Sequence, residues 1–338
     1  MSTLHIVSVG MVTAVGLDAP SSCAAMRARL DGFRETRFYA EDGQWMIGAP
    51  VPIPRNWVGQ QRMAHLCAGA ICEAFAHRPD ARGYTPIILC LAEEERTGKP
   101  VGNGPALLRA IGEIAEIEPH PHSRVIGHGR PSGHVALDLA RKLFASERVS
   151  YVMIAGADSY LTSASISYYI AASRILGPDQ PNGFIPGEAA AAVLCSRQGP
   201  GGLRLHGLGL AREPAYIYNP DRSALRGTGM TSAYRAALDE TGIAMNRLGY
   251  RIADLIGEQY WFKQTELASL KLVRGAHGFQ DLWSPGESLG NIGAAVVPVM
   301  IGMAYMAAAK GYAAGNPVLI EASGDTGACG AAVFAGAA

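Results

Sequence analysis

The sequence predicts an α/β protein built around buried strands. Apolar runs of strand length alternate along the chain with segments whose apolar residues recur at helical spacing. One pattern, a turn followed by a helix, a strand and a small-residue turn, occurs in both halves of the chain. Of the 338 residues, 49% are hydrophobic and 17% are charged, so the chain can bury a large core and disorder is not expected. Together these features predict one compact unit made of two closely joined halves.

Strands and helices alternate through the first half. We expect strands at 4–9, 85–92 and 123–127, and helices near 19–30, 60–77, 104–117 and from Ser132 onward. The helix near 60–77 is predicted by apolar residues at helical spacing, namely Met63, Leu66, Cys67, Ile71 and Phe75. The run TPIILCLA at 85–92 is short and almost continuously apolar, which is typical of a fully buried strand.

The repeated pattern relates the second half to the first. GRPSGHVALDLARKLF precedes the strand SYVMIAGADS in the first half, and GNIGAAVVPVMIGMAYMAAA precedes the strand PVLIEASGDTG in the second. A further apolar strand follows each unit, at 188–196 and 330–336. The repeat predicts a duplicated fold with its site at the seam between the halves. The stretch SRQGPGG at 196–202 separates them by its glycines and proline, which gives halves of 1–198 and 199–338.

The composition argues against several classes of protein. Lys+Arg and Asp+Glu each total 29, so the overall charge gives no electrostatic case for binding nucleic acid or an anionic membrane. The six cysteines are scattered without zinc spacing, and we expect free thiols, no metal and no cofactor. The N-terminal stretch has no basic region before an apolar run, which argues against a signal peptide and for a cytoplasmic protein. The apolar run from Gly290 to Ala309 contains Asn291, Pro298 and three glycines, and predicts a buried helix rather than a membrane span.

Five segments, taken together and in order, resemble the thiolase superfamily, and most of all its β-ketoacyl synthase branch. They are VSVGMVTAVGLDAPSSCAAMRARLDGFRETRF near the start, YVMIAGADSYLT at 151–162, GFIPGEAAAAVL at 183–194, SLGNIGAA at 288–295 and EASGDTGACGAAVF at 321–334. The resemblance implies a thiolase-like fold of two duplicated α/β halves in a five-layered αβαβα arrangement. It also implies a homodimer in which one sheet continues across the two subunits.

The catalytic positions of that family fall on unexpected residues in this chain. In the family, a cysteine at the N-terminus of a buried helix attacks an acyl thioester, assisted by two histidines or by a His–Asn pair. By resemblance, the cysteine position falls at Arg130. The first histidine position falls near Glu258 or Gln259, within a stretch (207–276) that contains no histidine, and the second position falls at Asn291. Because arginine stays protonated in proteins, Arg130 cannot act as the nucleophile.

Other residues near these positions leave two interpretations open. Ser132 is either a substitute nucleophile or the N-cap of the helix that it begins. His128 and His134 are either bases for such a nucleophile or structural histidines. Cys329 is either a nucleophile or, as we expect, a small residue of the core. Glu266 matches a glutamate that the family carries a little beyond its first histidine.

The surroundings of Arg130 also leave alternatives. Its guanidinium either binds an anion at the mouth of the acyl tunnel or forms an internal ion pair, with Glu188 or Glu287, that plugs the tunnel. The aromatic run Tyr260–Phe262 either fills the pocket or forms a binding surface. The acidic run Glu93–Glu95 is either a solvated loop or a contact with a partner.

With its nucleophile replaced, the chain is predicted to be a catalytically degenerate β-ketoacyl synthase-like protein that acts as a binding or adaptor protein. It resembles the divergent proteins encoded beside type VI secretion effector genes, which implies a role in effector loading and a secreted effector or an acyl carrier protein as partner. One alternative is an acyltransferase or decarboxylase that acts on acyl thioesters and uses Ser132 or Asn291. Another is the non-catalytic partner subunit of an active ketosynthase, as a chain-length factor is.

Overall fold

The computed structural model describes residues 4–40, 43–54, 56–118, 120–147, 149–199, 202–219, 221–276 and 278–336. The strands of the first half are β1 (Leu4–Val12), β2 (Arg34–Tyr39), β3 (Trp45–Gly48), β4 (Ile87–Leu91), β5 (Arg124–Gly127), β6 (Tyr151–Ser159) and β7 (Glu188–Ser196). Those of the second half are β8 (Leu203–Arg212), β9 (Tyr250–Ala253), β10 (Asp281–Trp283), β11 (Val318–Ser323) and β12 (Ala328–Gly336). The helices are α1 (Ala19–Arg27), α2 (Gly59–Ala76), α3 (Gly104–Ala115), α4 (Ser132–Ser146), α5 (Ser163–Ala171), α6 (Thr228–Thr241), α7 (Gln259–Leu272), α8 (Gly286–Leu289) and α9 (Val296–Ala309).

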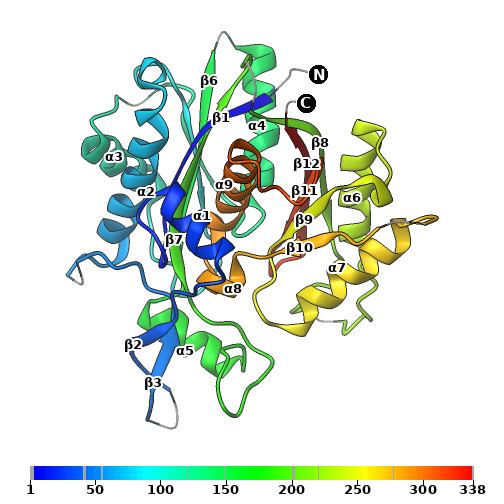
Figure 1. The fold of residues 1–338 in the computed structure, drawn as a ribbon. Helices are drawn as coiled ribbons and strands as arrows, with labels where there is room; N and C mark the ends of the chain where they lie inside the picture. Colours follow the sequence, from blue (N-terminus) through cyan, green and yellow to red (C-terminus); the bar gives the residue numbers. More distant parts are fainter. Residues whose placement is uncertain are drawn as a thin grey trace.

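Ten strands form one sheet in the order β10-β9-β11-β12-β8-β1-β7-β6-β4-β5, and β2 and β3 form a separate hairpin (Figure 1). From the outer edge of the sheet inward, the strands are β5-β4-β6-β7-β1 in the first half and β10-β9-β11-β12-β8 in the second. Both halves therefore arrange their five strands in the same spatial order. The directions match as well. In the first half β5 and β6 run parallel to β4, and in the second half β10 and β11 run parallel to β9. The remaining neighbours within each half are antiparallel. The α/β prediction is therefore confirmed, and the repeat in the sequence corresponds to a repeat in topology.

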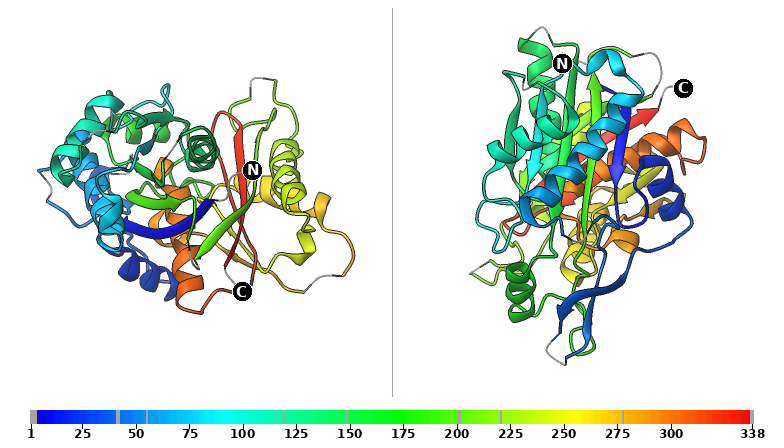
Figure 2. Two further views of the ribbon diagram at one scale, coloured as in Figure 1. Left: turned by 90° about the horizontal axis from the view of Figure 1, so that it is seen from above. Right: turned by 90° about the vertical axis from the view of Figure 1, so that its left-hand side faces the viewer.

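Helices cover the sheet on both faces and also lie between the two halves (Figure 2). On the outside, α2 packs on β1, β6 and β7 of the first half, and α6 packs on β8 and β12 of the second. Between the halves, α4 and α9 pack against each other and against strands of both halves. The halves join directly where β1 and β8 pair, over Leu4–Ile6 and Leu203–Leu205. This arrangement places the N-terminal end of α4 close to the end of β11.

Two glycines let α6 lie unusually close to β8. A Cβ atom on Gly207 would be 2.0 Å from the carbonyl oxygen of Ala237, and one on Gly209 would be 1.9 Å from that of Ala233. Such distances are impossible for real side chains, so glycine is needed at both positions. Leu203 and Leu205, which precede these glycines in β8, carry side chains that are buried.

The apolar run 290–309 forms a buried helix, as predicted, but the helix begins only at Val296. Gly290 and Gly293 adopt φ values of 64° and 54°, which belong to a turn rather than to a helix. From Val296 to Ala307 nearly every side chain is buried. In the described parts of the chain, no helix combines the length and the apolarity that crossing a membrane would require.

Candidate functional site

The turn before α4 brings Arg130 into the interior. Gly129 adopts a φ of 61°, and a Cβ atom there would be 2.0 Å from the Glu93 Oε1 atom, so the turn needs glycine. Arg130 follows directly and is 1% exposed. The N-terminal end of a helix carries a partial positive charge, so a guanidinium at this place needs nearby anions.

Two carboxylates and one aromatic ring surround the Arg130 guanidinium. Its Nη1 atom lies 3.0 Å from Asp254 Oδ2, and its Nη2 atom lies 3.5 Å from Asp325 Oδ1. The guanidinium carbon lies 3.8 Å from the ring centroid of Trp261, within cation–π range. Asp254 follows β9 and Asp325 lies in the turn between β11 and β12, so strand ends of the second half provide both anions.

A second buried arginine shares one of these carboxylates. Arg174 forms a bidentate pair with Glu258 through Nε–Oε1 (2.6 Å) and Nη2–Oε2 (2.7 Å). It also contacts Asp325 Oδ2 at 2.5 Å and donates to the Tyr218 hydroxyl. Asp325 therefore bridges the two guanidiniums, and bidentate geometry of this kind is specific to arginine.

A third ion pair completes what we call the charge cluster. Arg96 pairs with Asp158 at 2.8 Å and 2.5 Å, and both side chains are almost completely buried. The Glu93 carboxylate lies beside this pair and against Gly129, and its Oε2 atom has no hydrogen-bond partner in the described structure. The charge cluster is thus defined by three arginines and five acids: Arg96, Arg130, Arg174, Glu93, Asp158, Asp254, Glu258 and Asp325.

The imbalance between three cations and five acids is reflected in the proton affinities. Burial raises the pKa of Asp254 to about 6, although Arg130 opposes this shift. Burial also raises the pKa of Glu93 above its ordinary value. For Asp325, burial alone would raise the pKa, but Arg174 and Arg130 outweigh it and hold the pKa below its ordinary value.

Arg130 therefore forms an internal ion pair, but not with the predicted partners. Glu188 accepts instead from Arg62, in a bidentate pair, and from the backbone N–H of Val51. Glu287 is exposed. The prediction of Glu188 or Glu287 was wrong because spacing in the sequence does not reveal which strand ends converge on the start of α4.

Ser132 is the first residue of α4 rather than its N-cap, and its hydroxyl makes loop contacts. The Oγ atom accepts from the backbone N–H of His128 at 3.0 Å and donates to the carbonyl of Leu91 at 3.4 Å. His134 Nε2 contacts the carbonyl oxygen of Ile320, and burial lowers the pKa of His134 to about 4. The His128 residue is exposed. Among the described hydrogen bonds, none joins the Ser132 hydroxyl to a histidine ring.

The residues expected at the positions of the catalytic histidines and asparagine differ in their surroundings. Glu258 belongs to the charge cluster, whereas Gln259 is an exposed residue at the start of α7. Asn291 is buried, and its Oδ1 atom accepts from the backbone N–H of Gly293 at 3.1 Å. Glu266 is exposed, and its nearest cation is Arg251 at 3.4 Å.

Of the other residues considered in the sequence, some lie in the interior and some at the surface. Trp261 is buried and donates from Nε1 to Glu258 Oε2 at 2.8 Å, so it fills the site, whereas Phe262 is 45% exposed. Glu93 is shielded within the charge cluster rather than solvated, whereas Glu94 and Glu95 are exposed. Cys329 is buried, and burial raises its thiol pKa to about 12, as suits a core residue.

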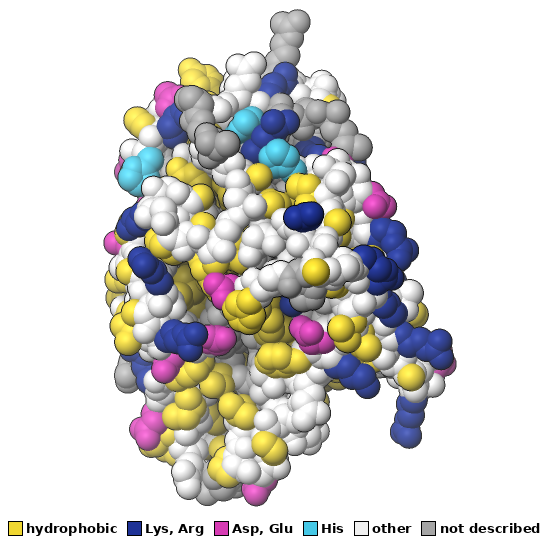
Figure 3. All heavy atoms as spheres, turned by 45° about the vertical axis from the view of Figure 1, so that its right-hand side comes forward, with side chains coloured by type: hydrophobic (Ala, Val, Ile, Leu, Met, Phe, Trp, Pro, Cys, Tyr) yellow, Lys and Arg dark blue, Asp and Glu magenta, His cyan; other side chains and the backbone are white. Residues whose placement is uncertain are grey.

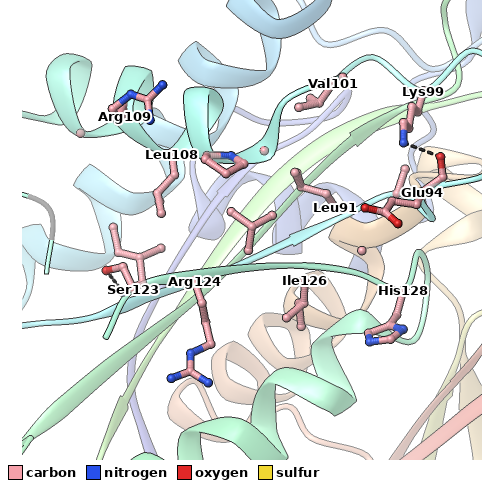
Figure 4. Close-up of a pocket in the computed structure, with 18 of the residues that line it drawn as sticks. Leu91, Glu94, Lys99, Val101, Leu108, Arg109, Ser123, Arg124, Ile126 and His128 are labelled. Carbon is pink, nitrogen blue, oxygen red and sulfur yellow. Dashed lines mark hydrogen bonds between the residues drawn. The ribbon is translucent and has the colours of Figure 1, made fainter. Parts of the chain in front are cut away.

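A cavity of about 790 Å³ lies beside α3 and β5, outside the charge cluster (Figure 4). Leu91, Val101 and Leu108 contribute apolar lining. At its rim, Lys99 Nζ donates to the backbone oxygen of Glu94. Since β5 is the last strand of the sheet, the cavity adjoins an edge that has no neighbouring strand in the described structure.

Comparisons with known proteins relate this architecture to ketosynthases. No protein-family model and no curated protein matches the sequence. Among solved structures, the ishigamide ketosynthase/chain length factor is 16% identical, with complete coverage of both chains and a TM-score of 0.79. A ketosynthase in complex with its chain length factor from Xenorhabdus doucetiae is 13% identical, covering 99% of this chain and 98% of that one, with a TM-score of 0.75. A β-ketoacyl synthase from Burkholderia phymatum STM815 is 14% identical, with complete coverage of both and a TM-score of 0.73.

The chain therefore has the thiolase-like fold of these ketosynthases, which confirms the fold implied by the sequence resemblance.

Proposed function

We propose that this chain is a non-catalytic ketosynthase-fold protein that acts by binding a protein partner. The observation that supports the proposal is the place of Arg130, at the start of the buried helix where a nucleophilic cysteine is expected by resemblance. A guanidinium neither attacks a thioester nor gives up its proton in proteins. Trp261 and two carboxylates occupy the space around it, where an acyl group would have to lie.

The favoured partner is a second chain of the same fold. The names of two similar structures describe a ketosynthase together with a chain length factor, so this fold is found in paired subunits. In this chain β5 ends the sheet, and its Arg124 and Gly127 are exposed. An unpaired edge strand offers free backbone hydrogen-bonding groups to another strand. Pairing of β5 with the same strand of a second copy would give the homodimer predicted from the sequence.

Effector loading for type VI secretion and binding of an acyl carrier protein remain predictions from resemblance. No contact within the described residues favours either of them over a second ketosynthase-fold chain. Co-expression with proteins encoded beside this one, followed by purification, tests both: a stable complex supports the adaptor role, and its absence with every neighbour removes that role.

Dimerisation through β5 is expected to give a particle of about twice 35.6 kDa at micromolar concentration, measured by light scattering after gel filtration. Successive N–H groups of an edge strand point alternately to the neighbouring strand and to the free side. Of the two variants Arg124→Pro and Val125→Pro, one therefore removes an N–H group that points to β4, and the other removes an N–H group on the free side. The proline on the free side should leave the fold intact and yield a monomer, whereas the other should destabilise the fold. A wild-type monomer would contradict this interface.

No covalent acyl intermediate is expected on incubation with acyl-thioester or acyl carrier protein substrates. The Ser132 hydroxyl forms hydrogen bonds with two backbone groups, and none of its described hydrogen bonds is to a histidine ring. It therefore lacks the general base that activates a serine nucleophile. Intact-mass measurement of the wild type and of Ser132→Ala should show no adduct with either. A stable wild-type adduct that Ser132→Ala abolishes would instead establish the acyltransferase alternative.

A further inference from the structure

The equal totals of acidic and basic residues conceal an uneven distribution. Between residues 221 and 276, all of which the structure describes, seven exposed side chains are cationic and three are acidic. The cations are Arg222, Arg226, Arg235, Arg247, Lys263, Lys271 and Arg274, and the acids are Asp221, Asp239 and Glu266. Figure 3 shows several Lys and Arg side chains gathered along one edge of the molecule.

Helix α7 carries part of this charge together with exposed apolar side chains. Its inner side is buried through Trp261, Gln264, Thr265, Ala268 and Ser269. At 3.6 residues per turn, Lys263 and Leu270 lie opposite the buried side of the helix, whereas Phe262 and Lys271 lie at its two margins. Phe262 is 45% exposed and Leu270 is 70% exposed.

Neighbouring loops add to this surface at the C-terminal end of α7. Lys271 Nζ donates to the backbone oxygen of Arg226, and Asn246 Nδ2 donates to that of Arg274 at 2.8 Å. These contacts hold two more exposed cations beside the helix. Phe279, in the loop that follows, is 92% exposed. We call Phe262, Lys263, Leu270, Lys271, Arg226 and Arg274 the α7 face.

We propose that the α7 face docks on an anionic phospholipid surface. Surfaces that lie in the membrane interface combine Lys and Arg with Phe or Leu side chains that enter it. On α7, the exposed Phe262 and Leu270 beside Lys263 and Lys271 offer this combination. The cations attract anionic headgroups, and Phe262 and Leu270 enter the boundary between headgroups and acyl chains. An acidic protein is the other candidate. Lys263 and Lys271 favour lipid, because Lys is depleted in protein–protein interfaces, whereas Arg226 and Arg274 fit either partner.

One acidic residue lies among these side chains. Glu266 occupies the stripe between Phe262 and Leu270, and its carboxylate lies 3.4 Å from Arg251. That contact offsets its charge locally, so cations outnumber free carboxylates on the α7 face. The balanced total of the whole chain, which argued against an anionic membrane, does not describe this surface.

Vesicle flotation tests the proposal on the full chain. Wild type is expected to float with POPC/POPG vesicles (70:30) at low salt, not with POPC alone, and to be released by 0.5 M NaCl because salt screens exposed charges. Each cation near an anionic surface strengthens binding roughly fivefold, so Lys263→Glu with Lys271→Glu should weaken it at least about tenfold. Leu270→Ser should weaken it severalfold while keeping the salt dependence.

The control variants change exposed side chains elsewhere on the molecule. Lys142→Glu changes a side chain that is 69% exposed on α4, and Tyr84→Ser changes one that is 77% exposed, and both should bind vesicles like wild type. The proposal is overturned if wild type does not float with POPG vesicles, or if the double charge reversal floats as well as the controls. Binding to polyglutamate without flotation would assign the α7 face to an acidic protein instead. None of these outcomes depends on the dimer or acylation experiments.

Discussion

Replacing Arg130 with methionine is expected to lower the free energy of unfolding by about 3–5 kcal/mol. Methionine keeps much of the volume but removes the cation, which leaves Asp254 buried without its ion-pair partner and Asp325 with only Arg174. The contact with Trp261 is lost as well. Urea unfolding, followed by tryptophan fluorescence, measures the effect from the midpoint and slope.

A double variant separates two contributions to the loss of stability. One is the lost attraction between Arg130 and Asp254, and the other is the cost of leaving Asp254 buried without a partner. Arg130→Met with Asp254→Asn removes both partners of the 3.0 Å contact, so it should recover part of the loss, with a coupling of roughly 0.5–3 kcal/mol. Lys142→Met is the matched control, because its pair with Asp138 is exposed and should contribute less than about 1 kcal/mol. A loss for Arg130→Met as small as that of the control would show that the charge cluster does not hold the fold together.

The pH dependence of stability is expected to change when Asp254 becomes asparagine. The folded pKa of about 6 lies above the ordinary value of 3.8, so the folded state binds more protons than the unfolded state between these values. Stability from this group is thus fully present below about pH 3.8 and is lost as the pH rises through about 6, by up to about 3 kcal/mol in total. Asparagine mimics the neutral acid, so Asp254→Asn should match wild type near pH 4 and exceed it at pH 7.

Urea unfolding of both proteins at several pH values between 4 and 7 measures this difference. Asp325 provides the opposite case, because its folded pKa is lowered, and its contribution is present above about pH 3.8 and lost as the pH falls further. The stability gap for Asp325→Asn should therefore stay nearly constant between pH 4 and 7 and shrink only below about pH 3.8. If the gap for Asp254→Asn instead shrinks as the pH rises, attraction to Arg130 outweighs burial and the expected sign is wrong.

The sequence predicted the architecture well because that information is local and repeated. The alternation of strands and helices, the repeat in the two halves and the buried helix before β11 all follow from short patterns of apolar and small residues. Arg130 could be found because the family resemblance places the cysteine position at the turn in which it stands. The strands, the helices and the repeat can each be recognised from residues that are close together in the sequence.

The partners of Arg130 could not be predicted, for a physical reason. Asp254 is 124 residues away and Asp325 is 195 residues away, and only the topology of the sheet brings them to the start of α4. Arg174 lies after α5, in a stretch without any periodic pattern. The one available signal was an acidic residue close after a buried strand. Asp254 follows β9 directly, and Asp325 is the second residue after β11.

The way in which Asp325 bridges two guanidiniums also limits how this protein can change over generations. A single codon change that placed cysteine at position 130 would remove the cation that pairs with Asp254 and Asp325, so the variant is expected to lose stability. A reactive thiol at this place therefore requires the acids to be replaced together with Arg130, which makes it difficult to acquire by stepwise mutation.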